Sequence, residues 1–295
     1  MEKSAFSSYT VVEEYEHDVL GELDMNALRI MVAALIVATA IAAPASAKEP
    51  VEGVKVGRMS ILRNLVSEEK LEQQAGLQYD ALTRKAYQQQ ALLGDNHATT
   101  KRVRRIANDM LPHAAKFNER AKTWKWEINV INSPTINAFC MPGGKIVVFT
   151  GIIDKLQMTD DEIALVVGHE IAHALREHSR ARAAKSTITN VGAIAAGLLI
   201  GGNVGQLAQV GGDLLGRRFS RTDETEADLV GMELAARAAY DPRAGVHLWE
   251  KMSAAAKGAP PQWLSTHPSG TTRIQTFKDN IKDVLPLYEK AKAGG

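Results

Sequence analysis

Two histidines and a glutamate in GHEIAHALREHSR, residues 168–180, have the types and the spacing of a metal site. Each residue of an α-helix advances by about 100°, so His173 lies about 40° from His169 and Glu170 about 100° from it. The three side chains therefore share one face of a helix. Two neutral imidazoles one turn apart can bind Zn²⁺, and the adjacent carboxylate can act as base on the attacking water. The pattern predicts zinc-assisted peptide hydrolysis with Glu170 as the catalytic base.

Catalytic zinc also needs a third protein ligand, and histidines four residues apart occur on ordinary helix surfaces as well. The positions where one class of zinc peptidase places a glycine and a third histidine hold Arg176 and Ser179. His178 is nine residues from His169, about 180° around a continuous helix, so we do not expect it to reach the same metal. The third ligand must then come from another segment.

The acidic segment ETEAD, residues 224–228, can supply that ligand. Glu224 and Asp228 are four residues apart and share a helix face, whereas Glu226 points elsewhere. We expect Glu224 to be the third ligand, and Asp228 to accept a hydrogen bond from a ligating imidazole and fix its tautomer. Taken alone, the segment would be typical of a solvated acidic helix turn. Downstream of the two histidines, it completes a zinc site.

The segment that precedes the histidines predicts a small antiparallel sheet. Three β-branched or alternating segments predict its strands: residues 126–134, Ile136–Cys140 and Lys145–Thr150. Ile136–Cys140 is expected at the edge of the sheet, facing the helix of the metal site. There Asn137, Ala138 and Phe139 would pair with an extended peptide substrate through main-chain hydrogen bonds. The alternative is an ordinary packed strand.

Most of the remaining chain predicts helix, so the fold class is α+β and mostly α. Thr159 and Glu162 form a capping box that starts the helix of the metal site, which we expect to run through Arg182. Other helical segments lie between Gly57 and Lys122, at residues 217–240 and at Thr271–Lys292. We expect three regions: residues 1–47, a helical scaffold at 48–125 and a metallopeptidase core at 126–295.

Residues 1–47 are typical of an N-terminal extension followed by a signal peptide. Ile30–Ala43 is an uncharged run, and Ala45-Ser46-Ala47 after it is an Ala-x-Ala cleavage site. We expect translation to start at Met25, cleavage after Ala47 and a periplasmic mature protein. An uncleaved anchor is the alternative, although a membrane span needs about 20 residues. No cysteine directly follows the run, so a lipoprotein is not expected.

Composition limits the partners further. The net charge is +1, and the mildly basic charge beyond residue 47 is too dispersed to indicate nucleic-acid binding, although it would favour contact with a membrane surface. Cys140 is the single cysteine, which excludes disulfides within the chain and cysteine zinc clusters. Val191–Leu215 is an apolar run with one charged residue, Asp213, and it contains seven glycines. We expect a mobile segment over the site, with a membrane span as the alternative.

Four segments, taken together and in order, resemble the HtpX and CAAX-prenyl-protease family of zinc metallopeptidases, most closely its soluble periplasmic branch that contains BepA and LoiP. They are NAFCMPGGKIVVFTGII, GHEIAHALREHS, SRTDETEAD followed by Gly231, and LSTHPSGTTRI. The resemblance implies a gluzincin-type endopeptidase with one Zn²⁺ per chain, held by His169, His173 and Glu224, with Glu170 as the base. It also implies a role in envelope protein quality control, with unfolded or misassembled envelope proteins as substrates and the outer-membrane assembly machinery as a further partner.

The resemblance also implies that His267 can approach the metal. It would act either as a fourth ligand that keeps the enzyme latent or as a catalytic donor to the oxyanion of the reaction. Two other functions remain open. A chaperone could use the same sheet edge with little turnover, and a membrane-integral peptidase could span the bilayer through Ile30–Ala43 and Val191–Leu215.

Overall fold

The structure, a computed structural model, describes residues 52–186, 218–257, 261–267 and 271–294. The expected signal peptide and the glycine-rich segment Val191–Leu215 therefore lie outside the described residues. In the part of the chain that is described, no helix combines the length and the apolar character that crossing a bilayer requires.

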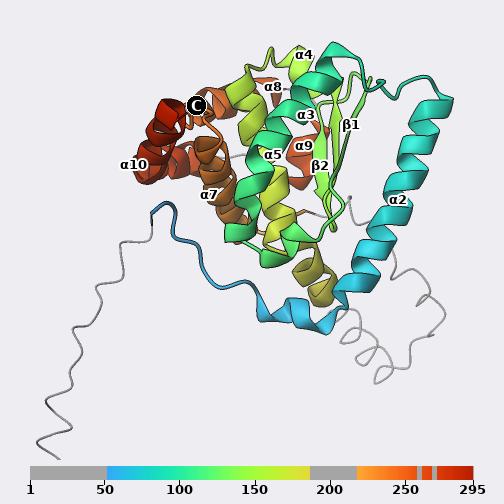
Figure 1. The fold of residues 1–295 in the computed structure, drawn as a ribbon, viewed down its shortest axis with the longest axis horizontal. Coiled ribbons are helices and arrows are strands. Elements are labelled where there is room, and N and C mark those ends of the chain that lie inside the picture. The colour runs from blue at the N-terminus through green and yellow to red at the C-terminus, as the bar shows by residue number, and fades with distance from the viewer. Residues whose placement is uncertain (1–51, 187–217, 258–260, 268–270, 295) are drawn as a thin grey trace, which may run out of the picture. The chain divides into compact units, whose positions relative to one another are not determined.

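The fold is mostly helical with one small sheet, as the sequence predicts (Figure 1). In chain order the elements are the 3₁₀ helix η1 Ile61–Leu65, α2 Glu68–Gln88, α3 Ala98–Met110, the 3₁₀ helices η2 Leu111–Lys116 and η3 Glu119–Lys122, β1 Glu127–Ile131, β2 Ala138–Met141, β3 Lys145–Phe149, α4 Thr150–Lys155, α5 Asp160–Leu175, α7 Arg221–Arg237, α8 Ala244–Ala255, α9 Gln262–Thr266 and α10 Thr271–Gly294.

The sheet has the order β1-β3-β2, with β2 at an edge as expected. The β2–β3 pair is antiparallel, but β1 pairs with β3 in parallel, so the sheet is mixed rather than antiparallel. The reason is topological. The chain reverses after β1 and again after β2, and β3 then enters between the two earlier strands. The residue pattern identifies each strand but does not specify which one lies in the middle.

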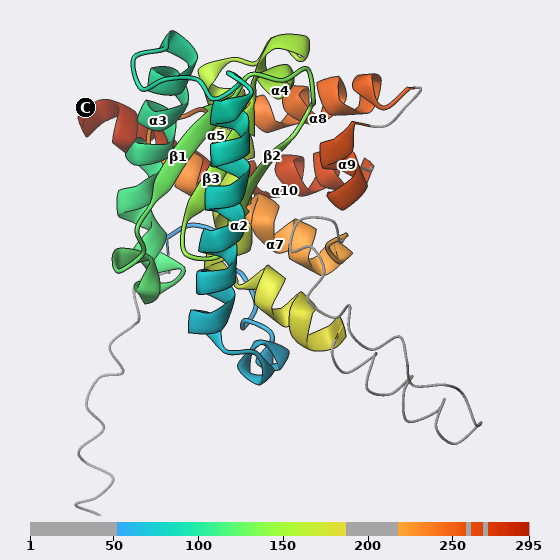
Figure 2. The same ribbon diagram turned by 90° about the vertical axis from the view of Figure 1, so that its right-hand side faces the viewer.

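Helices cover both faces of this sheet (Figures 1 and 2). Figure 2 shows α2 crossing in front of the strands. Side chains alternate along a strand, so Ala138 and Cys140 of β2 join the main core with α3 and α5. Phe139 and Met141 face the other way and pack with Tyr79 of α2 in a smaller cluster. The edge strand is thus held between two helical layers.

The central helix α5 begins at the predicted capping box. The Thr159 hydroxyl accepts a hydrogen bond from Glu162 N, and the Glu162 carboxylate accepts one from Thr159 N, at 3.2 and 2.9 Å. Every residue from Glu162 to Leu175 is buried, because the helix lies between the sheet, α3, α7 and α8. The metal-site residues on α5 are therefore held in a rigid, water-poor environment.

The far end of α5 differs from the prediction. The helix ends at Leu175, because Glu177 adopts a φ of 54°, and residues 178–186 form a separate helix. The single helix predicted through Arg182 is therefore wrong. No glycine or proline marks the break. Arg176 stabilises it instead, through hydrogen bonds to a backbone carbonyl and to a carboxylate from distant segments.

Two glycines bring α5 and α7 into backbone contact. A Cβ atom added at Gly231 of α7 would lie 2.6 Å from His169 N and 2.8 Å from the Gly168 carbonyl carbon. The helices can approach this closely only because neither residue carries a side chain. This contact places the first turn of α7, which carries Glu224, opposite the histidines of α5.

Candidate metal centre

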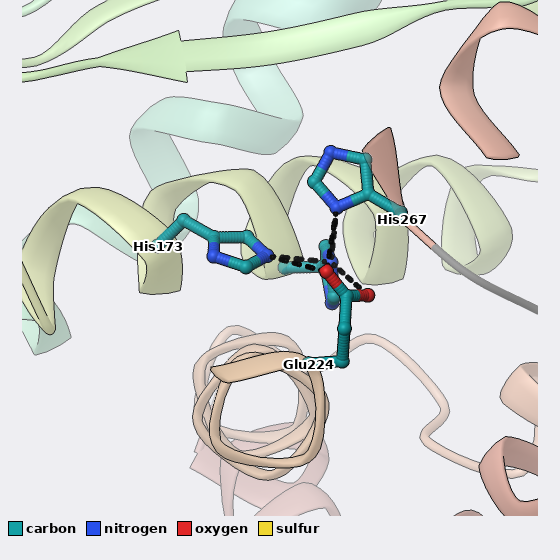
Figure 3. Close-up of side chains that lie close together, drawn as sticks. His173, Glu224 and His267 are labelled. Atoms are coloured by element: carbon teal, nitrogen blue, oxygen red, sulfur yellow. Dashed lines mark hydrogen bonds and ion pairs between the residues drawn. The ribbon is translucent and has the colours of Figure 1, made fainter. Parts of the chain in front are cut away.

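Four buried side chains from three elements converge on one point (Figure 3). His169 and His173 come from α5, Glu224 from the first turn of α7, and His267 from the residue that ends α9. One ligand atom from each lies within 4.8 Å of all the others. The sequence predicts the first three as ligands, and the structure brings all four together.

The spacing of these atoms fits a tetrahedral zinc ion. His169 Nε2 and His173 Nε2 are 3.0 Å apart, and they lie 3.7 and 3.6 Å from the Glu224 carboxylate oxygens. His267 Nδ1 is 3.3 Å from His169 Nε2 and 3.1 Å from Glu224 Oε1. Zinc bonds of about 2.0–2.1 Å in tetrahedral geometry give ligand separations of roughly 3.3–3.4 Å. Four nitrogen and oxygen donors at these distances can hold such an ion.

Burial lowers the pKa of both His169 and His173 well below the usual value, because the water-poor interior penalises the charged ring. Both are therefore neutral imidazoles, the form that binds a metal. The Asp228 carboxylate lies 3.1 Å from His169 Nδ1. A proton on Nδ1 that is donated to Asp228 leaves the lone pair of Nε2 directed at the cluster, which is the placement expected for Asp228.

His173 has an equivalent support that the sequence analysis missed. Its Nδ1 lies 2.9 Å from His178 Nδ1, and His178 Nε2 lies 3.4 Å from the Glu226 carboxylate. Because α5 ends before His178, the 180° separation expected on a continuous helix does not apply. His178 is outside the four-residue cluster, but it contacts a member of that cluster. No local sequence signal marks the backbone break that allows this contact.

Arg273 of α10 is a second residue that the sequence analysis missed. It is 3% exposed and forms ion pairs with both Glu224 and Asp228, while its guanidinium lies 4.0 Å from the Trp249 ring centroid. It therefore compensates the negative charge that the two carboxylates bring into the interior. Arg273 lies within the LSTHPSGTTRI segment, which is the signal that could have identified it.

Glu170 is placed for proton transfer beside the cluster. Burial raises the pKa of its carboxyl to about 7. The Trp263 indole N–H donates a hydrogen bond of 2.6 Å to Oε1, and His267 Nε2 lies 3.5 Å from the same oxygen. Trp263 was not anticipated from the sequence. This hydrogen bond orients the Glu170 carboxylate beside the four-residue cluster.

A cleft of about 360 Å³ connects this centre to the edge strand. It is lined by residues 137–142, which include the predicted Asn137, Ala138 and Phe139, and by Glu170, His173 and His267. The structure therefore places the expected substrate strand and the expected base on one continuous surface.

The main chain of β2 has an unpaired side toward this cleft. Asn137 O accepts a hydrogen bond of 3.1 Å from Phe149 N. Paired and outward-pointing residues alternate along antiparallel strands, so the register of β2 on β3 directs the amide and carbonyl groups of Ala138 and Cys140 away from β3. These groups are free of the ladder and can pair with an added strand. Asn137 and Phe139, which were also expected to pair with a substrate, direct their main-chain groups toward β3 instead.

Comparison with known proteins identifies a peptidase family and metallopeptidase relatives, in agreement with the metal site described above. The model of Peptidase family M48 matches residues 97–281, more than half of the chain. The mitochondrial metalloendopeptidase OMA1 of Arabidopsis thaliana is 38% identical over 173 residues, or 57% of this chain and 35% of that protein. The metalloprotease LoiP of Escherichia coli is 29% identical over 190 residues, or 63% of this chain and 72% of that protein.

A third relative is the beta-barrel assembly-enhancing protease of Escherichia coli, 30% identical over 171 residues, or 54% of this chain and 35% of that protein. The matches span between 35% and 62% of the length of the mitochondrial relatives from the plant and two yeasts. All of these relatives are named as proteases or metalloendopeptidases. With the family model matched across the sheet, the histidine helix and the glutamate helix, the chain belongs to peptidase family M48.

Proposed function

We propose that this protein is a zinc-dependent endopeptidase, with His169, His173 and Glu224 as metal ligands and Glu170 as general base. The observation that carries the proposal is the set of ligand-atom separations, 3.0 to 3.7 Å, beside a buried carboxylate. Bound zinc would polarise the scissile carbonyl and lower the pKa of the attacking water.

The residues of the chain supply the rest of the reaction. The free main-chain groups of Ala138 and Cys140 bind the substrate as an added strand and hold its peptide bond beside Glu170. The Glu170 carboxylate takes the proton of the attacking water and passes it to the leaving amine. Trp263 keeps that carboxylate oriented through its 2.6 Å hydrogen bond.

Digestion of casein, an unfolded substrate, tests this proposal. Purified protein should cleave casein, and both a chelator and Glu170→Gln should abolish the cleavage. Metal analysis should find about one zinc per chain in the wild type and in Glu170→Gln, but much less in Glu224→Ala. Proteolysis that survives both the chelator and Glu170→Gln would refute the endopeptidase. Binding of casein without cleavage, by the wild type and by His267→Ala alike, would favour the chaperone instead.

We further propose that His267 is a fourth ligand that keeps the enzyme latent. Its Nδ1 lies 3.3 and 3.1 Å from atoms of two other ligands, in the position that a catalytic site leaves open for water or substrate. His267→Ala should therefore raise the rate of casein cleavage. A lower rate would favour the oxyanion role of His267, and an unchanged rate would eliminate both roles.

The proposed setting is the periplasm, where the enzyme would degrade misfolded or unassembled envelope proteins. The support is the signal-like sequence that ends at Ala47 together with the relative named for enhancing beta-barrel assembly. N-terminal sequencing of the protein from a periplasmic extract should begin at Lys48. Recovery in the cytosolic fraction would contradict this location, and an N-terminus that retains Ile30–Ala43 would contradict cleavage after Ala47.

A further inference from the structure

The cleft along β2 has an apolar wall on the side that faces α2. Leu82 of α2 and Phe149 at the end of β3 line the cleft together with Phe139. The rings of Phe139 and Phe149 lie 6.1 Å apart, and Leu82 and Phe149 are half-buried against the cluster between α2 and the sheet. Among the described residues that line the cleft, Glu170 is the one carboxylate and none is lysine or arginine.

This wall lies on the opposite face of β2 from the metal centre. Phe139 belongs to the cluster with α2, whereas Ala138 and Cys140 belong to the core with α5. A peptide that pairs with the free edge of β2 continues the same pleated sheet, so its side chains also alternate between the two faces. The substrate residue opposite Phe139 would direct its side chain toward α2. The substrate residues before and after it would direct theirs toward the metal centre.

We propose that Leu82, Phe139 and Phe149 form a subsite that selects a bulky apolar side chain at alternate positions of the substrate. This inference rests on the proposed peptidase function and deepens it. Leucine, isoleucine, methionine or phenylalanine would bury apolar surface against the two rings and Leu82. A charged side chain would lose its hydration there, and none of these three residues carries a charge that could pair with it. The preferred substrate is thus an extended, unfolded segment with apolar residues at every second position.

Cleavage-site profiling tests the subsite. A mixture of denatured proteins is digested, and the new termini are identified by mass spectrometry. The wild type should enrich bulky apolar residues at a fixed position near the cut, and Leu82→Ala should lower that enrichment on the order of tenfold, the range that small changes in an apolar pocket produce. Leu77→Ala is the matched control, because Leu77 is on the same helix but 67% exposed. It should keep the wild-type profile.

A binding measurement separates the subsite from the activity itself. In Glu170→Gln, fluorescence anisotropy compares two labelled peptides that carry leucine or serine at every second position. The leucine peptide should bind more tightly, and adding Leu82→Ala should remove most of that difference. Absence of cleavage by both the wild type and His267→Ala would contradict the peptidase function and leave this binding result to decide the subsite. Equal binding of both peptides, or an unchanged preference in Leu82→Ala, would overturn the subsite.

Discussion

At the scale of single residues, the centre depends on which ring nitrogens carry protons. If His173 Nε2 is to bind a metal, its Nδ1 must carry the proton and donate it to His178 Nδ1, 2.9 Å away. His178 must then carry its own proton on Nε2, where the Glu226 carboxylate lies 3.4 Å away. One consistent arrangement of protons therefore orients His173, as Asp228 orients His169.

Removing His178 should accordingly weaken zinc binding without removing a ligand. We expect His178→Ala to lower zinc affinity by about 10- to 100-fold, the usual effect of losing a partner that orients a ligating imidazole. Competition with a chromophoric chelator measures this affinity. His247→Ala, which removes an exposed histidine, is the control and should match the wild type. Equal zinc affinities in the two variants would show that His178 does not orient His173 for metal binding.

The residues found from sequence and those missed differ in one physical respect. His169, Glu170 and His173 lie within one helical turn, so their relation follows from helix geometry alone. Trp263 lies 93 positions from Glu170, to which it donates its hydrogen bond, and Arg273 lies 49 and 45 positions from the carboxylates of Glu224 and Asp228 that it contacts. Their roles depend on tertiary packing, which no local spacing encodes.

At the scale of elements, the crossing of α5 and α7 fixes the distance between Glu224 and the histidines. Gly231→Ala would place a Cβ atom 2.6 Å from His169 N, and the backbone there cannot move as a side chain can. The helices should separate, with a loss of about 1–3 kcal/mol in the free energy of unfolding and weaker zinc binding.

The control for this variant is the same substitution on another helix. Gly76 of α2 has no atom within 4 Å of an added Cβ, so Gly76→Ala should stabilise the protein by about 0.4–1 kcal/mol. Urea unfolding of both variants measures the two effects, which should have opposite signs. A Gly231→Ala protein that is as stable as the wild type and binds zinc equally well would contradict the close crossing.

The start of α5 is tied to α3 by a pH-sensitive contact. Burial favours the protonated Asp160, but hydrogen bonds from Arg102 and Arg105 outweigh it and lower the pKa of this carboxyl below its usual value. A folded-state pKa below that of the unfolded state contributes stability at neutral pH, and this contribution is lost as the pH falls below about 4.

Asp160→Asn should thus be less stable than the wild type at pH 7. The difference should shrink in urea titrations at about pH 3.5, and a difference that stays constant with pH would contradict the contact.

The predictability of the elements also follows from where their signals lie. The capping box at Thr159 and the alternation in β3 are local, and both elements form where the sequence places them. The position of β3 between β1 and β2, and the end of α5 at Leu175, depend on contacts with distant segments. The residue pattern therefore predicts the individual helices and strands, but it predicts neither the order of the three strands nor the end of α5 at Leu175.

At the scale of the whole molecule, a metal ion would join segments that are otherwise linked only by packing. Its four candidate ligands come from α5, α7 and the end of α9, and the chain that connects α5 to α7 includes residues outside those that the structure describes. A ligand that binds only the folded state stabilises it by RT ln(1 + [L]/Kd), or about 2.7 kcal/mol at a hundredfold excess over Kd. For a protein of this size that corresponds to an increase of roughly 5–10 °C in Tm.

Calorimetry should therefore show a lower Tm after chelation and recovery on addition of zinc. Glu224→Ala should show smaller changes than the wild type, because the ion would no longer link α7 to the other two elements. An identical Tm with and without chelator in the wild type would mean that these four side chains do not bind a metal that stabilises the contacts between the helices.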